Sequence, residues 1–187
     1  MRLLAIFIFS FCILGCNHPE SSNYNRENSL RQSNDEKKLG NNDIKNRPVP
    51  SSDTSTTYKV IGVKDGDTFE LLVDNSPLVV RFAHIDCPEK KQPFGQKAKQ
   101  FVSDICFGKY VSLKHNNKYD RNHRLIAEII LEDGTNLNKL LIENGFAWHF
   151  KKYSKDEEYS RLENEAKLGK KGLWADENPI PPWIWRK

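Results

Sequence analysis

The chain has 187 residues, which suits one domain with additional segments, since domains usually contain about 50 to 250 residues. Its formal net charge is +4, and residues 58–187 hold 22 Lys or Arg against 19 Asp or Glu. This mild excess permits a polyanionic partner but does not by itself indicate one. The sequence contains no internal repeat, which excludes a repeat architecture.

The first sixteen residues show the pattern of an export signal. A single basic residue, Arg2, precedes the apolar run LLAIFIFSFCIL, and Gly15-Cys16 follows the run. The run is too short to span a bilayer comfortably. The ending ILGC resembles a bacterial lipobox, which implies cleavage before Cys16, a lipid on its sulfur and a protein anchored in the cell envelope. Because Leu14 stands where a smaller residue is more usual, plain secretion and an uncleaved anchor are the alternatives.

Residues 17–57 form a polar segment. They include fifteen Asn or Ser and only five apolar residues. So few apolar side chains cannot offset the entropy lost when a chain becomes ordered. We therefore expect a disordered tether over 17–57 and a folded domain over 58–187, where aromatic and β-branched residues become frequent.

Two cysteines, Cys87 and Cys106, lie in the predicted domain. An exported protein can oxidise such a pair. The sequence does not show whether the two residues lie close enough for a disulfide, so both states stay open.

Five segments of the domain have the composition of β-strands. Residues 58–63, 68–73 and 78–85 are rich in β-branched and aromatic residues, and the turn signals DG and DNSP separate them. These segments predict a three-stranded meander. Residues 110–116 and 125–131 predict two more strands with a polar segment between them.

Three segments predict helices, over residues 93–108, 135–145 and 154–169. A proline starts the first, a threonine is the expected cap of the second, and Ser154 with Glu157 forms an S-x-x-E capping box for the third. Each segment carries an apolar stripe at helical spacing and ends at a glycine.

The order β-β-β-α-β-β-α-α predicts an α+β domain. Five short strands around one intervening helix suit a small Greek-key barrel of the oligonucleotide-binding (OB) type, with three α-helices covering it. Three tryptophans near the C-terminus, Trp174, Trp183 and Trp185, are most simply packing anchors.

The stretch RFAHIDCPE, residues 81–89, places charges of both signs at a strand end. Asp67 follows the first turn and Asp86 ends the third strand, so both carboxylates can meet at the barrel rim. They would repel one another unless a cation lay between them. Oxygen ligands suit Ca²⁺, with the backbone carbonyl of Cys87 and water molecules completing the set. The sequence has no thiol–histidine cluster and no H-E-x-x-H motif, so zinc is the poorer prediction.

Three further charged side chains indicate chemistry on a phosphodiester. Glu89 follows Pro88, which stiffens the loop, and is placed to act as a general base on a metal-associated water. Arg81 and Arg124 can bind phosphate oxygens and stabilise charge as the phosphorus becomes five-coordinate. Because Arg81 and Asp86 are five positions apart, a regular strand would point them to opposite faces, and a bulge or sharp bend near Asp86 is required.

Each of these features has an ordinary structural explanation when it is taken alone. Asp65-Gly66-Asp67 is typical of a hairpin turn, Arg81 of a solvated strand position, and Arg124 of a charged loop. His84 is more simply a packed histidine than a metal ligand. The combination is much more specific than its parts.

Together, the motifs resemble the staphylococcal nuclease family over about residues 58–175. They are, in order, DGDT (65–68), R-x4-D-x-P-E (81–89), the PFGQKAKQF helix (93–101), a degenerate D-R-x-x-R (120–124), GFAW (145–148) and GLW (172–174). The resemblance implies an OB-type barrel and Ca²⁺-dependent hydrolysis of DNA and RNA to products that end in a 3′-phosphate.

The resemblance also implies roles for single residues. The implied calcium ligands are Asp67, Asp86 and the backbone carbonyl of Cys87, with Asp65 as a nearby second acid. The implied catalytic residues are Glu89 as general base and Arg81 and Arg124 as stabilisers of the transition state. The residues assigned to the substrate are Arg121, Lys151 and Tyr153.

Departures from the family pattern concern substrate binding. Asn122-His123 replace Tyr-Gly, Lys151 stands where a tyrosine is expected, and the loop after Glu89 is short. Fewer aromatic side chains should weaken base stacking, which contributes about 1 to 3 kcal/mol per base. Lys151 and Lys152 can compensate through contacts with phosphates.

The leading interpretation is a monomeric, Ca²⁺-dependent endonuclease that acts on DNA and RNA outside the cytoplasm and is anchored to a bacterial membrane by a lipid. The alternative from another class is a catalytically inactive OB-type module that binds nucleic acid or an acidic polymer at the cell envelope. A surface lipoprotein that contacts only protein partners would leave the charged rim unexplained.

Overall fold

The computed structural model describes residues 50–187. The predicted signal with its lipidated Cys16, and most of the predicted tether, lie outside the described residues. Residues 50–57, expected in the tether, contact the domain. Ser112 Oγ donates to the carbonyl of Thr54 at 2.7 Å, and His115 Nε2 lies 3.0 Å from the carbonyl oxygen of Pro50. The folded domain therefore includes residues that precede 58.

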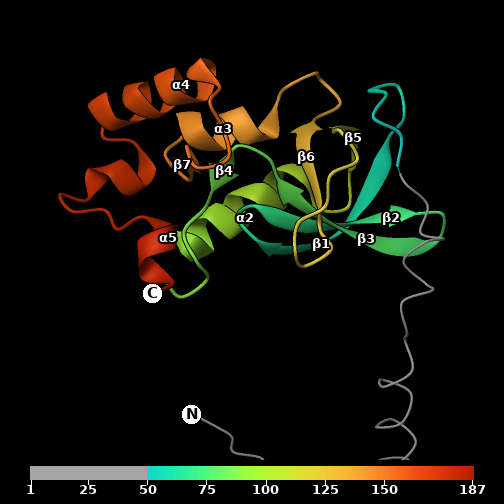
Figure 1. The fold of residues 1–187 in the computed structure, drawn as a ribbon, viewed down its shortest axis with the longest axis horizontal. Helices are drawn as coiled ribbons and strands as arrows, with labels where there is room; N and C mark the ends of the chain where they lie inside the picture. Colours follow the sequence, from blue (N-terminus) through green and yellow to red (C-terminus); the bar gives the residue numbers. More distant parts are fainter. Residues whose placement is uncertain (1–49) are drawn as a thin grey trace, which may run out of the picture. The chain divides into compact units, whose positions relative to one another are not determined.

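A closed β-barrel forms the centre of the domain (Figure 1). Its strands are β1 (Tyr58–Asp65), β2 (Thr68–Val73), β3 (Ser76–Phe82), β5 (Tyr110–Lys114) and β6 (Leu125–Ile130), in the spatial order β1-β2-β3-β6-β5. Neighbouring strands are antiparallel, except that β3 and β6 run parallel. Buried apolar residues alternate along strands such as β6 and fill the interior. The predicted α+β fold with an OB-type barrel is confirmed.

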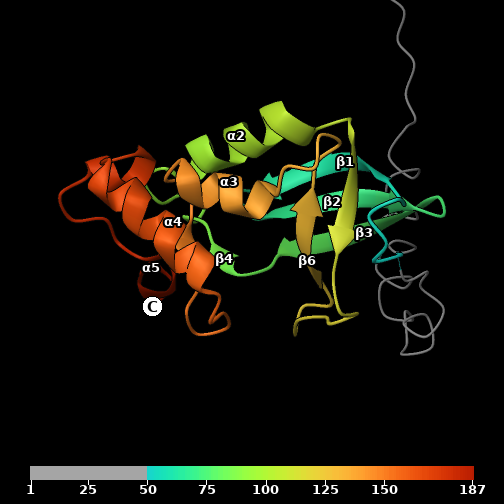
Figure 2. The ribbon, with the colours of Figure 1, turned by 90° about the horizontal axis from the view of Figure 1, so that it is seen from above.

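Three longer helices accompany the barrel: α2 (Gly95–Cys106), α3 (Leu137–Glu143) and α4 (Glu157–Leu168). A short 3₁₀ helix, η1 (Gly172–Ala175), and the single turn α5 (Pro182–Trp185) follow. α2 packs against β1, and Figure 2 shows α4 lying farther from the barrel than α3.

Predicted helix starts differ from the observed ones by one to three residues. α2 begins at Gly95 rather than at residue 93, since Phe94 before it adopts a left-handed φ of 67°. The caps of α3 and α4 are Asn136 and Asp156 instead of residues 135 and 154. The hydroxyl of Ser154 is engaged elsewhere, because it lies 2.9 Å from a ring nitrogen of each of two histidines, His84 and His149.

The third predicted strand is shorter than expected and is followed by a sharp bend. β3 ends at Phe82 instead of continuing to residue 85, and His84 has a positive φ of 67°. The chain then forms β4 (Ile85–Asp86), which leaves the barrel and pairs antiparallel with β7 (Trp148–His149). This break is the bend that the odd offset between Arg81 and Asp86 required.

Asn138 of α3 holds the break in place. Its fully buried side chain accepts a hydrogen bond from the Ile129 N–H at 3.0 Å. It also donates to the carbonyls of Ala83 and Ala127 at 2.9 and 3.2 Å. The amide thus satisfies a backbone carbonyl, that of Ala83, at the point where the strand stops.

Aromatic side chains attach the C-terminal segment to the domain. Trp174 is buried and packs edge-to-face on Trp148, with ring centroids 4.3 Å apart. Trp183 of α5 lies 5.6 Å from Trp148 and stacks on Phe150 at 5.5 Å. Trp185 is 42% exposed, so the prediction that it is a packing anchor is wrong. α5 is therefore held mainly through Trp183.

Candidate active site

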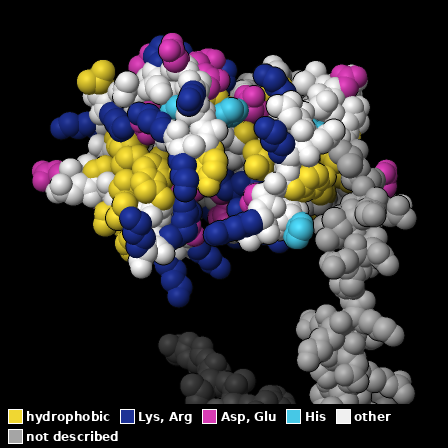
Figure 3. All heavy atoms as spheres, viewed as in Figure 1, with side chains coloured by type: hydrophobic (Ala, Val, Ile, Leu, Met, Phe, Trp, Pro, Cys, Tyr) yellow, Lys and Arg dark blue, Asp and Glu magenta, His cyan; other side chains and the backbone are white. Residues whose placement is uncertain are grey.

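An open cleft of about 1250 Å³ lies between the barrel rim and the β4–β7 pair. Small-molecule pockets usually measure about 300 to 1000 Å³, so the cleft is large enough for a segment of a polymer. Figure 3 shows Lys and Arg side chains gathered on this face beside an apolar patch, with acidic side chains between them. The basic residues that line the cleft are Arg81, Arg121, Arg124, Lys151, Lys152, Lys167, Arg186 and Lys187.

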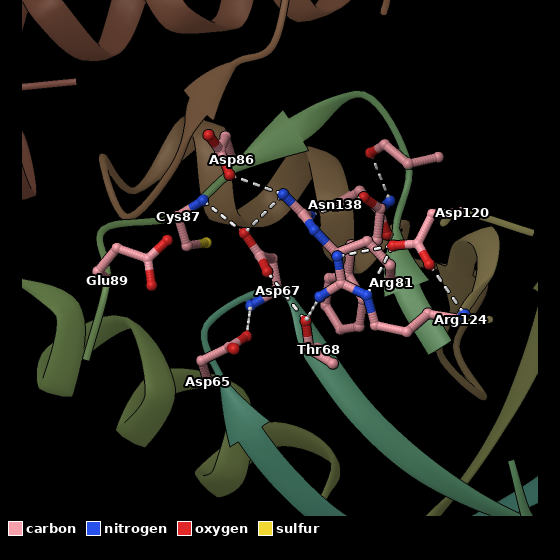
Figure 4. A network of polar contacts seen from close by, with 12 residues as sticks. Asp65, Asp67, Thr68, Arg81, Asp86, Cys87, Glu89, Asp120, Arg124 and Asn138 are labelled. Carbon is pink, nitrogen blue, oxygen red and sulfur yellow. Dashed lines mark hydrogen bonds and ion pairs between the residues drawn. The ribbon is translucent and has the colours of Figure 1, made fainter. Parts of the chain in front are cut away.

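Arg81 joins the two carboxylates that were expected to meet. Its Nη2 lies 2.7 Å from Asp86 Oδ1 and 3.1 Å from Asp67 Oδ2 (Figure 4). Asp67 Oδ2 also accepts a hydrogen bond from the Cys87 N–H at 2.6 Å. The side chains come from β3, β4 and the turn before β2, so the bend after Phe82 is what brings them together.

Burial dominates the electrostatics of this cluster. The Asp86 side chain is only 1% exposed, and burial raises its pKa even though Arg186 and Arg81 act in the opposite direction. Burial, followed by repulsion from Asp67, raises the pKa of Asp65 to about 6. Burial lowers the pKa of Arg81, but the charges of Asp67 and Asp86 outweigh it, and that pKa lies above its ordinary value.

These residues fit a divalent cation that prefers oxygen. Asp67 and Asp86 approach the same nitrogen of Arg81, so their oxygens converge on one point where a cation can lie. Among residues 50–187 no cluster of three or more His, Cys, Asp or Glu surrounds a single point. The side chains therefore supply part of a ligand set, and backbone carbonyl and water oxygens would have to complete it.

Glu89 stands on a tightly built loop after β4. Its N–H donates to Gln92 Oε1 at 3.0 Å, and its carbonyl accepts from the Gln92 N–H at 2.8 Å. Gln92 Nε2 in turn donates to the carbonyl of Ile180 at 2.5 Å. A Cβ on Gly95 would lie 1.9 Å from the Glu89 carbonyl oxygen, so only glycine lets α2 begin there. The carboxylate itself is 39% exposed and faces the cleft.

Asp120 holds the guanidinium of Arg124 through two of its nitrogens. Its Nε and Nη2 both lie 2.7 Å from Asp120 Oδ2, and its Nη1 donates to Thr68 Oγ1 at 3.3 Å. Thr68 Oγ1 donates to Asp67 Oδ1 at 3.2 Å, which links Arg124 to the acidic cluster. Burial tends to raise the pKa of Asp120, but hydrogen bonds from Arg124 outweigh it and the pKa is lowered. Asp120 is thus the residue that orients Arg124.

The residues assigned to the substrate line the same cleft. Tyr153 is 73% exposed and lies edge-on to Phe150, with ring centroids 5.0 Å apart. Lys151 is 61% exposed and pairs with Glu163 at 3.5 Å. Arg121 is exposed at the rim. Phe150 and the stacked Trp183 add aromatic surface that the sequence did not predict.

Arg186, which sequence reasoning did not select, reaches the centre of the site. Its Nη2 lies 2.5 Å from Asp86 Oδ2, and its Nη1 donates to Glu89 Oε1 at 2.6 Å and to Asp86 Oδ1 at 3.3 Å. The residues it contacts lie 100 and 97 positions earlier. No motif surrounds it in the sequence, and only the basic ending RK could have drawn attention to it.

His84, Cys87 and Cys106 are part of the packed structure. His84 lies between Ser154 Oγ, 2.9 Å from its Nδ1, and Glu128 Oε1, 3.8 Å from its Nε2, which agrees with the prediction of a packed histidine. Cys87 and Cys106 are both buried free thiols in this structure. Burial raises the pKa of Cys106 to about 12.

Comparisons with known proteins agree with this geometry. The profile of the family described as "Staphylococcal nuclease homologue" matches residues 79–176. An uncharacterized endonuclease of Haemophilus influenzae is 41% identical over 132 residues, which cover 70% of this chain and 73% of that protein. The chain belongs to the staphylococcal nuclease family. A second relative, an uncharacterized endonuclease of Escherichia coli O157:H7, is 37% identical over 128 residues, or 68% of this chain and 83% of that protein. A micrococcal nuclease of Shigella flexneri is 34% identical over 138 residues, or 69% of this chain and 79% of that protein.

The family profile ends before the C-terminal segment. Arg81, Asp86, Glu89 and Arg124 lie within the matched residues 79–176, whereas α5 and Arg186 follow them. The profile match therefore does not cover Asp65, Asp67 or Arg186, although all three line the cleft.

Proposed function

We propose that this chain is a Ca²⁺-dependent endonuclease that hydrolyses phosphodiester bonds of DNA and RNA to products ending in a 3′-phosphate. Membership of a nuclease family supports the hydrolase role. The single observation that carries the finer proposal is the contact of Arg81 with both Asp67 and Asp86 in a basic cleft that also exposes Glu89. That arrangement supplies cation ligands, a phosphate-binding donor and a base within one site.

Each charged residue has a separate task in this proposal. Glu89 accepts a proton from the attacking water while the water oxygen bonds to phosphorus. The bond from phosphorus to the 5′-oxygen of the next nucleotide breaks, and that oxygen takes a proton from solvent, so the phosphate stays on the 3′ side. Arg81 and Arg124 donate to phosphate oxygens and stabilise the added charge. Asp67, Asp86 and the Cys87 carbonyl would hold the calcium, with Asp65 nearby. When bound, calcium supplies positive charge that offsets the negative charge of the phosphate.

Substrate binding combines charge with stacking. Lys151 and Arg121 are assigned to phosphates, and exposed Tyr153 to a base, since every base offers a face that an aromatic ring can stack on. All of these residues come from one chain, which supports a monomeric enzyme.

The proposed location is the cell envelope, with the chain exported and held by a lipid on Cys16. No helix among residues 50–187 is long and apolar enough to cross a membrane. The proposal rests on the pattern of residues 1–16. Cys16→Ser should abolish lipid labelling of the protein and release it from the membrane fraction.

The test of the reaction uses single-stranded DNA with the purified protein in Ca²⁺ or in a calcium chelator. Glu89→Gln keeps the size of the side chain but removes the base, and we expect turnover to fall by about 10² to 10⁴. Glu132→Gln is the matched control, because Glu132 is an exposed acid outside the cleft. Undiminished cleavage by Glu89→Gln would refute the role of Glu89. Salt-dependent binding without Ca²⁺-dependent cleavage would support the inactive binding module instead.

A further inference from the structure

Arg186 occupies the oxygens that a cation held by Asp86 would use. We propose that Arg186 is an autoinhibitory residue: its guanidinium competes with Ca²⁺ for Asp86 and restrains Glu89, so that Ca²⁺ binding displaces it. The inference rests on the proposed function and concerns Arg186, which lies outside the residues that the family profile matches.

The first step is the occupancy of Asp86. Its Oδ2 lies 2.5 Å from Arg186 Nη2, and its Oδ1 lies 3.3 Å from Arg186 Nη1 and 2.7 Å from Arg81 Nη2. Both oxygens of a side chain that is 1% exposed are thus engaged by guanidinium groups. A positively charged guanidinium and a divalent cation repel one another, and Arg186 occupies Asp86 Oδ2, the oxygen that Arg81 leaves open, so binding of Arg186 there disfavours binding of the cation.

The second step is the restraint on Glu89. Arg186 Nη1 donates to Glu89 Oε1 at 2.6 Å, so the same guanidinium spans the proposed ligand and the proposed base. A carboxylate oxygen that accepts a charge-assisted hydrogen bond is not available to accept a proton from water. Displacement of Arg186 would therefore open the metal site and free the base together.

The third step is that Arg186 can leave without unfolding the domain. It follows α5, a four-residue helix, and its side chain is 43% exposed. The segment is attached independently, through Trp183 packed against Trp148 and Phe150. Rotation of one side chain at the end of the chain is enough to release both carboxylates, while α5 stays docked.

The experiment measures Ca²⁺ affinity by calorimetry, without nucleic acid, for the wild-type protein, Arg186→Ala and Arg186→Lys. Because the Arg186 side chain is 43% exposed, solvent screens its charge and the competition is modest, so we expect Arg186→Ala to tighten Ca²⁺ binding by about three- to tenfold. Arg186→Lys keeps the positive charge but loses the guanidinium, which contacts Asp86 and Glu89 through two nitrogens. The Ca²⁺ affinity of this variant should lie between those of the wild-type protein and Arg186→Ala. A second readout is the Arg186 Nε–Hε resonance, which should shift as Ca²⁺ is added to the wild-type protein.

Lys187→Ala distinguishes competition between Arg186 and Ca²⁺ from the general effect of removing a positive charge. It deletes a neighbouring positive charge, and Lys187 forms no ion pair with any residue between 50 and 187. We expect it to change Ca²⁺ affinity less than about twofold, since an exposed charge is screened. Equal effects of Lys187→Ala and Arg186→Ala would overturn the competition, and so would unchanged or weaker Ca²⁺ binding by Arg186→Ala.

Failure of this inference is distinguishable from failure of the proposed function. A wild-type protein that binds Ca²⁺ and cleaves DNA, with no change of affinity in Arg186→Ala, would overturn the role of Arg186 alone. A wild-type protein that neither binds Ca²⁺ nor cleaves DNA would overturn both.

Discussion

Gly95→Ala tests whether the position of Glu89 matters for catalysis. In the structure a Cβ at residue 95 would lie 1.9 Å from the Glu89 carbonyl oxygen and 2.7 Å from its carbonyl carbon. Carbon–oxygen contacts are normally no closer than about 3.3 Å, so the two backbones must separate by about 1.4 Å. Because the contact is with backbone, no side-chain rotation can relieve it.

The expected consequence is mainly catalytic. A misplacement of about 1 Å can reduce a rate by about 10²-fold, and we expect a loss of kcat of that order. Overpacking should also lower the free energy of unfolding by about 1 to 3 kcal/mol. Steady-state cleavage of single-stranded DNA and urea denaturation measure the two effects separately.

Two controls show whether Gly95→Ala lowers kcat by displacing Glu89. In Gly169→Ala the nearest contact of the new Cβ would be 3.3 Å, at a helix end with a φ of −78°, so activity should be kept. The double variant Gly95→Ala/Glu89→Gln should be no slower than Glu89→Gln alone, because the base is already absent. A folded Gly95→Ala protein with wild-type kcat would refute the reasoning.

Three other predictions concern buried groups. Asn138→Leu leaves the Ile129 N–H and the Ala83 carbonyl without that partner and should lower the unfolding free energy by about 2 to 4 kcal/mol, as measured in urea. Burial lowers the pKa of His149 below its ordinary 6.5, with Glu163 opposing. As the pH falls, the unfolded chain therefore binds a proton at His149 at a higher pH than the folded chain does. The stability that neutral His149 contributes is fully present above pH 6.5 and is lost as the pH falls below 6.5. Denaturation midpoints at about pH 7.5 and pH 5.5 should differ less in His149→Gln than in the wild type. Burial raises the pKa of Cys106 to about 12, so iodoacetamide at about pH 8 should modify it only as fast as the chain opens. Rapid modification of native protein would contradict that value.

Local sequence patterns predicted most of the barrel because strand alternation and turn residues act over short distances. The error in the third strand has a physical cause. Residues 83–85 continue the apolar pattern, but the φ of His84 and the pairing of β4 with β7 depend on residues more than sixty positions away. Ser154 was misassigned for a related reason, since two histidines from other segments compete for its hydroxyl.

Site residues were predictable to the extent that they stand in short motifs. Asp67, Asp86 and Glu89 lie within twenty-three positions of one another. The β2–β3 hairpin, in which Thr68 pairs with Arg81, brings Asp67 to the end of β3, and the bend after Phe82 then brings Asp86 close to it. Arg186 belongs to no motif, and its contacts appear only once α5 has folded back. A residue brought to a site by a terminal segment leaves no periodic or spacing signal in the sequence.

The buried acids connect the stability of the fold with the reaction. Carboxylates such as Asp67 and Asp86 are costly to bury, and Arg81, 13% exposed, offsets that cost by lying against both of them. A buried arginine held at one end by carboxylates is also a preorganised donor, because its orientation does not have to be established when phosphate arrives. Charged residues at a strand end therefore violate the usual preference for apolar interiors, and such violations mark functional sites. This is why residues 65–89 predicted the chemistry more sharply than they predicted the path of the chain.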